Sequence, residues 1–229
     1  ETETVPGTAG MILDYISGPE SNGGYDVFNS FKQGKLRKKL TKMTLREVLA
    51  IDWRGIGAMS SAAGRYQIIR ATLEGLIAEL GLSLDMVFSA DLQDRLAYHL
   101  LRRRGYDAWT TGRITTTEFG KRLAMEWASL PVLAGTKNYK GKNIKRGTSY
   151  YAGDGLNSHG VSAGSFETML ENAMIYKERF NIEAVEVKTS KKTGSALAAG
   201  GAALGAGSAV VASDPSSLPD VGTLTTVAM

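Results

Sequence analysis

The stretch GMILDYISGPESNGGYD, residues 10–26, places a glutamate between an apolar segment and a glycine-rich turn. The apolar residues of its first half recur at helical spacing, and Gly18-Pro19 is a pair that normally ends a helix. The pattern therefore predicts a helix that ends just before Glu20. A carboxyl group at this position faces the negative end of the helix dipole and apolar neighbours, which raise its pKa. Because a general acid near neutral pH needs a raised pKa, Glu20 is the candidate catalytic residue.

Residues 60–67, SSAAGRYQ, form a second segment with a distinct composition. Its small residues and glycine let a polymeric ligand come close to the backbone. Tyr66 and Gln67 would add an aromatic surface and an amide, a combination that suits sugar binding. We therefore expect this segment to line a ligand groove.

The remainder of residues 1–187 is predicted to be mainly helical, with capping residues at Thr44, Ser89, Thr115 and Ser162. Residues 21–42 mix glycines with basic and aromatic residues, a composition that favours a short irregular hairpin. Residues 132–160 show no clean period and are expected to form a long functional loop. The predicted fold class is α+β, mainly α, with a small β hairpin.

Composition changes sharply near Lys188, which divides the chain into a domain at 1–187 and a tail at 188–229. Residues 196–212, ALAAGGAALGAGSAVVA, contain 8 Ala and 4 Gly, a low-complexity composition typical of a flexible linker. Their 17 residues reach the short limit of a membrane span, so weak membrane contact is the alternative.

Composition also excludes several classes of chemistry. The chain has no Cys and two His, so a thiol nucleophile, a disulfide scaffold and a Cys or His metal cluster are not expected. We expect no metal or organic cofactor and chemistry led by carboxylates. The net charge of +4 is small, and the basic run at 35–42 has no accompanying nucleic-acid motif, so nucleic acid is not an expected partner.

The two segments above are followed by Trp-Ala-Ser-Leu-Pro at 127–131. Three motifs in this order resemble the lysozyme-like superfamily, specifically lambda-type phage endolysins and their soluble lytic transglycosylase relatives. The resemblance covers roughly residues 8–180. It implies that Glu20 protonates the glycosidic oxygen between N-acetylmuramic acid and N-acetylglucosamine in peptidoglycan.

The resemblance also implies roles for other residues. Tyr66 and Gln67 would line the glycan groove, and Ser60 and Ser61 would face Glu20 across the cleft. In the long loop, a late aromatic residue would come from Tyr150 or Tyr151, and Asn157 is a further candidate for substrate binding.

The resemblance leaves the mechanism open. Hydrolases hold a second carboxylate about 5–9 Å from the acid, whereas lytic transglycosylases use one Glu and let the muramic 6-hydroxyl attack, which leaves a 1,6-anhydro end. Asp26 and Asp52 are candidate second carboxylates, but neither falls in a recognisable pattern, so transglycosylation is favoured over hydrolysis.

A third hypothesis is a non-catalytic glycan-binding structural protein of a phage particle, with other particle components as partners. The resemblance implies a phage-encoded protein that acts in the bacterial periplasm or is delivered with the virion, with membrane association through the tail as a further expectation.

Overall fold

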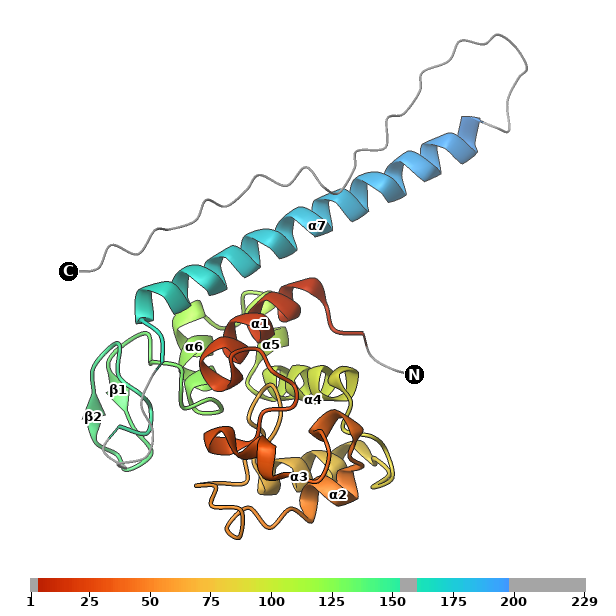
Figure 1. Cartoon of the computed structure of the whole chain (residues 1–229). Coiled ribbons are helices and arrows are strands. Elements are labelled where there is room, and N and C mark those ends of the chain that lie inside the picture. Colours follow the sequence, from red (N-terminus) through yellow and green to blue (C-terminus); the bar gives the residue numbers. More distant parts are fainter. Residues whose placement is uncertain (1–3, 153–159, 198–229) are drawn as a thin grey trace, which may run out of the picture. The chain divides into compact units, whose positions relative to one another are not determined.

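The structure, a computed structural model, describes residues 4–152 and 160–197. The chain divides into two units, residues 1–184 and 185–229. The predicted boundary between residues 187 and 188 falls inside the last helix, α7 (Ala163–Leu197), and stays a prediction. The first unit is built from helices and one small sheet (Figure 1).

The helices and strands of the described residues are α1 (Gly7–Ser21), η1 (Asn29–Lys35), η2 (Leu40–Lys42), α2 (Leu45–Leu49), α3 (Arg70–Leu80), α4 (Ala90–Arg103), α5 (Tyr106–Thr110), α6 (Thr116–Ala124), β1 (Thr136–Lys137), β2 (Asn143–Ile144) and α7. Here η denotes a 3-10 helix. The two strands pair antiparallel, with Thr136 opposite Ile144. This composition confirms the predicted mainly-α α+β class.

The helices that begin with a capping residue start where the sequence predicts. Thr44 and Glu47 form a reciprocal capping box at α2. The hydroxyls of Ser89 and Thr115 each accept a hydrogen bond from the backbone N–H three residues on, at the starts of α4 and α6. Ser162 does the same at α7. Local hydrogen bonding thus fixes these boundaries independently of tertiary structure.

The predicted end of the first helix is wrong, because α1 continues through Pro19 to Ser21. Gly18 has no side chain to clash with the proline ring, so the residue before proline stays helical. The helix ends where Asn22 and Gly23 adopt left-handed conformations, with φ of 52° and 76°. Their N–H groups bind the carbonyls of Gly18 and Ser17, which satisfies the free end of the helix.

The predicted hairpin at residues 21–42 is also wrong, since η1 and η2 occupy that segment. Phe28 and Leu40 are buried there and anchor the chain to the core, and basic side chains fill the intervening positions instead of an alternating apolar face. The small hairpin is formed by β1 and β2, inside the segment predicted to be a long loop.

Helix α3 begins at Arg70, directly after the loop that contains residues 60–67, and α6 ends at Ala124. Trp127 lies in the turn after α6, where its side chain is 4% exposed. This turn redirects the chain so that the indole N–H reaches a distant backbone carbonyl, that of Tyr66.

A single hydrophobic core joins α1, α4, α6 and the first turns of α7. Trp109 and Phe119 stack with their ring centroids 4.7 Å apart, and Phe166 of α7 stacks on Tyr15 of α1. Helix α1 and the start of α7 are therefore held by the same core.

No helix within residues 4–152 and 160–197 is long and apolar enough to cross a lipid bilayer. The segment 196–212, for which weak membrane contact was one prediction, lies almost entirely outside the described residues.

Candidate active site

The Glu20 carboxyl lies in the last turn of α1 and is partly buried. Its Oε1 accepts a hydrogen bond of 2.5 Å from the Ser129 hydroxyl. Burial raises the pKa of Glu20, while hydrogen bonds from the hydroxyl and the backbone N–H of Ser129 act in the opposite direction. The raised pKa thus comes mainly from loss of hydration around the carboxyl group.

Ser129 belongs to the Trp-Ala-Ser-Leu-Pro motif between α6 and β1. Its carbonyl accepts a hydrogen bond of 2.8 Å from the N–H of Gly160, just before α7. A side chain on Gly160 would come within 2.8 Å of the Pro19 ring, so the glycine permits close approach to the end of α1. Residues from three distant parts of the chain therefore surround Glu20.

Sequence reasoning missed the role of Ser129, although the motif that contains it was recognised. The sequence feature that could have indicated this role is that Ser129 is the one polar residue in WASLPVL, residues 127–133. A hydroxyl in an apolar run that packs into a core requires a partner, and Glu20 is that partner.

The loop at residues 64–67 connects Glu20 to Ser129 through two backbone carbonyls. The hydroxyl of Ser21 donates to the Arg65 carbonyl at 2.8 Å. The indole N–H of Trp127 donates to the carbonyl of the next residue, Tyr66, at 3.2 Å. Ser21, next to Glu20, and Trp127, two residues before Ser129, are thus fixed on successive carbonyls of one loop, which brings the three motifs together.

The Tyr66 ring is 2% exposed, so it offers no free face for stacking on a sugar. Its hydroxyl donates to Asp94 at 2.6 Å, and the Tyr25 hydroxyl donates to the same carboxylate at 3.0 Å. Burial raises the pKa of Tyr66, with the Asp94 contact adding to the effect. The Arg65 guanidinium pairs with Asp14 at 2.6 Å. Tyr66 therefore belongs to a buried polar network that holds the loop in place.

Gln67 adopts a left-handed backbone conformation, with φ of 48°. Its side-chain amide donates to the carbonyls of Gly64, at 2.8 Å, and Val27, at 3.3 Å. A side chain on Gly64 would collide with Gln93, whose amide oxygen accepts from the Arg65 N–H. The polar atoms of this loop are largely used to maintain its own shape.

A family model described as endolysin matches residues 14–157, more than half of the chain. The chain belongs to the endolysin family. Membership implies a phage-encoded enzyme that degrades the peptidoglycan of the bacterial cell wall. No curated protein and no solved structure gives a significant match. The matched range of the endolysin contains Glu20, the 64–67 loop and Ser129.

The two serines predicted to face Glu20 in the endolysin are part-buried and hydrogen-bond locally. The Ser60 hydroxyl accepts from the Ala62 N–H at 3.2 Å. The Ser61 hydroxyl accepts from the Arg70 N–H at 2.9 Å and so satisfies the first turn of α3. Ser61 thus supports the helix that follows the loop.

The two candidate second carboxylates of the endolysin each accept a hydrogen bond from a backbone N–H. Asp26 accepts from the Thr41 N–H at 2.8 Å, and Asp52 accepts from the Gly55 N–H at 3.0 Å. No group of three or more potential metal ligands occurs among the residues that the structure describes.

Tyr151, the candidate late aromatic residue, is part-buried, and its hydroxyl donates to the Met125 carbonyl at 2.7 Å. Its ring contacts those of Tyr139 and Tyr150, each with a centroid separation of 5.4 Å. It therefore lies against the chain that leads from α6 to Ser129. Asn157 lies outside the described residues.

Proposed function

We propose that this endolysin cleaves the β-1,4 bond between N-acetylmuramic acid and N-acetylglucosamine, with Glu20 as general acid. The observation that carries the proposal is the partly buried Glu20 carboxyl, whose pKa is raised by burial and whose orientation is set by Ser129. A carboxyl group whose pKa is raised and whose direction is fixed is suited to the protonation of a glycosidic oxygen.

We further propose lytic transglycosylation. Glu20 gives its proton to the O4 leaving group of N-acetylglucosamine as the bond from muramic C1 to that oxygen breaks. The muramic 6-hydroxyl then attacks C1 and returns its proton to Glu20, which leaves a 1,6-anhydro ring. One carboxyl group serves as acid and then as base, while Ser129 stabilises its ionised form between the two steps.

The behaviour of Asp26 and Asp52 supports the single-carboxylate route. Asp26 accepts from the backbone N–H of Thr41 and so joins two segments of the chain, and Asp52 accepts from the N–H of Gly55 within its own turn. Hydrolysis, the alternative, needs a second carboxylate that is available to water or to the sugar. A carboxylate that already accepts a backbone hydrogen bond is a weaker candidate for that task than a free one.

The test is mass spectrometry of the muropeptides released from purified peptidoglycan by the wild type and by Glu20→Gln. We expect anhydro-muramic ends from the wild type and a loss of at least about 100-fold in the variant, the usual size of a general-acid contribution. Asp26→Asn and Asp52→Asn serve as matched controls and are expected to keep anhydro products.

Other products would support one of the two alternative functions. Reducing ends would identify a hydrolase, and loss of activity in one of the two aspartate variants would then identify its second carboxylate. No release by the wild type under any condition would favour a glycan-binding protein of the phage particle.

A further inference from the structure

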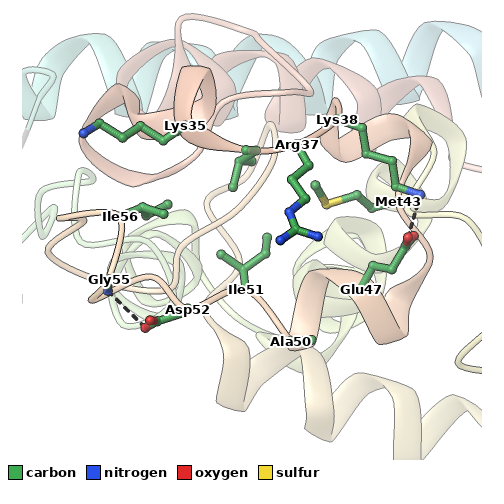
Figure 2. Close-up of a pocket in the computed structure, with 11 residues that line it drawn as sticks. Lys35, Arg37, Lys38, Met43, Glu47, Ala50, Ile51, Asp52, Gly55 and Ile56 are labelled. Atoms are coloured by element: carbon green, nitrogen blue, oxygen red, sulfur yellow. Dashed lines mark hydrogen bonds and ion pairs between the residues drawn. The ribbon is translucent and has the colours of Figure 1, made fainter.

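A surface cavity of about 730 Å³ lies between residues 35–38, at the end of η1, and residues 50–56, which follow α2. This volume falls in the range of sites that bind small molecules or short peptides. Figure 2 shows the Arg37 side chain directed from one wall toward Ile51 on the other, so its guanidinium lies within the cavity.

The lining combines cations with an apolar surface. Met43, Ile51 and Ile56 supply apolar contacts. Lys38 is paired with Glu47 at 2.6 Å, so its charge is largely compensated. Among the residues that the structure describes, none forms an ion pair with Arg37. Lys35 and the Asp52 carboxylate also line the cavity, and Asp52 accepts from the Gly55 N–H. The cavity thus presents the planar Arg37 cation beside apolar side chains, with cations in excess of carboxylates in its lining.

Both walls of the cavity are continuous with segments of the candidate active site. The first wall leads back through η1 to the turn after Glu20, and the second leads forward to the loop at 60–67. The Asn29 side chain joins the two by accepting from the N–H groups of Met59, at 3.1 Å, and Ser60, at 3.0 Å. Asn29 thus ties the segment that leads to the cavity to the start of the 60–67 loop.

We propose that the cavity binds the acidic peptide stem of peptidoglycan, with the Arg37 guanidinium paired to a stem carboxylate; this proposal rests on the proposed function. The stem is a short peptide with carboxylate groups and small apolar side chains. Arginine binds carboxylates through two parallel hydrogen bonds, and Met43, Ile51 and Ile56 provide contact area for methyl groups. The apolar lining favours a peptide over a phosphate-rich wall polymer, which would need charge alone.

A stem of four residues spans at most about 14 Å. The cavity does not have to lie in the glycan groove itself, because the stem branches from the muramic acid and can reach beside it. Binding of the stem would place the endolysin on cross-linked or stem-bearing wall in preference to bare glycan.

The test compares two substrates and two variants. Intact peptidoglycan carries stems, whereas glycan strands treated with an amidase do not. We expect Arg37→Gln to raise KM about tenfold on intact peptidoglycan, the effect of losing one charge-assisted hydrogen bond pair, and to show no such loss on stripped strands. Lys39→Gln removes the same charge from a neighbouring exposed residue outside the cavity and is expected to match the wild type on both substrates.

A binding measurement separates this proposal from the proposed function. Isothermal titration of a free stem tetrapeptide into Glu20→Gln should show binding that the double variant with Arg37→Gln lacks. If the wild type cuts no glycan but this difference persists, the stem site stands and the proposed function fails. Equal losses for Arg37→Gln and Lys39→Gln, or equal losses on both substrates, would overturn the stem site and indicate general attraction to anionic wall polymers.

Discussion

At the scale of single residues, two opposing influences act on the Glu20 carboxyl. Burial favours the protonated acid, and the Ser129 hydroxyl favours the carboxylate. An acid that must both release and recover a proton benefits from both influences, because one favours the protonated form and the other the ionised form. Ser129 is therefore a positioning residue that also adjusts the acidity of Glu20.

Ser129→Ala tests this role through the pH profile of kcat/KM. Loss of the hydroxyl removes a bond to the ionised form, so the pKa of Glu20 rises further and the alkaline limb of the profile moves to higher pH. We also expect roughly tenfold lower kcat at the optimum, because a hydrogen bond to a charged group contributes about 1.5–3 kcal/mol. Ser129→Thr keeps the hydroxyl and should keep the wild-type limb. A profile of Ser129→Ala that overlies the wild type would exclude the proposed effect.

The raised pKa of Glu20 also predicts how stability depends on pH. The folded state holds this proton to a higher pH than the unfolded chain, whose reference value is 4.5. Stability is therefore lost as pH rises from that value through the folded pKa. Glu20→Gln removes this titration, so its Tm should exceed that of the wild type at pH 7, and the two should converge below pH 4.

Glu47 provides a control of opposite sign for the thermal unfolding measurement. Hydrogen bonding to Lys38 lowers the pKa of this carboxyl, and backbone hydrogen bonding from Thr44 adds to the effect. A lowered pKa stabilises the fold above the unfolded value, and this stabilisation is lost on acidification. Glu47→Gln should thus have a lower Tm than the wild type at pH 7. If both substitutions shifted the Tm in the same direction, the assigned electrostatics would be wrong.

At the scale of elements, the sequence predicts what is decided locally. The caps at Thr44, Ser89 and Thr115 were predicted because a side chain and a backbone N–H three residues apart form the same contact in any fold. The end of α1 was misplaced because the proline signal at residue 19 is weaker than the left-handed turn at Asn22 and Gly23. The hairpin was misplaced because pairing depends on burial that the local sequence does not encode.

Two glycines, one in the turn that ends α1 and one inside the helix, give a prediction of opposite effects on stability. Gly23 has φ of 76°, and an added side chain would meet no atom closer than 3.9 Å, so the cost of Gly23→Ala is conformational. We expect it to lower the free energy of unfolding by about 1–2 kcal/mol and to reduce activity by disturbing Glu20. Gly10→Ala lies inside α1 with open space around it and should raise stability by up to about 1 kcal/mol. Urea unfolding curves measure both, and equal signs would contradict this account.

At the scale of the whole molecule, the site is assembled from segments that the sequence cannot pair by itself. Glu20 and Ser129 are 109 positions apart, and their contact depends on the packing of α1, α6 and the start of α7. Glu20 and the motif containing Ser129 could be identified from the sequence, whereas the hydrogen bond between them could not. Tyr66 illustrates the same limit. As an aromatic residue it was predicted to line a sugar-binding groove, but in the structure its side chain is buried against Asp94 and helps to hold the 64–67 loop in place.

The hydrophobic core includes residues outside the range 14–157 that the family model matches. This observation leads to a prediction about the smallest part of the chain that can fold. Ile12 and Leu13 precede residue 14, Phe166 and Leu170 follow residue 157, and all four are at most 1% exposed. Each contributes about 1.5–3 kcal/mol through burial, and a typical domain is stable by only about 5–15 kcal/mol in total. A chain limited to residues 14–157 should therefore show no cooperative unfolding transition by circular dichroism and no release of muropeptides.

A chain of residues 1–184, which contains the whole first unit, should unfold cooperatively and retain the peptidoglycan-degrading activity of the full chain. The same circular dichroism and muropeptide measurements apply to both truncations. Cooperative melting of the 14–157 chain would mean that α7 and the first turns of α1 only cover a core that is complete without them. In that case the contact of Gly160 with Pro19 would also be dispensable for the placement of Glu20.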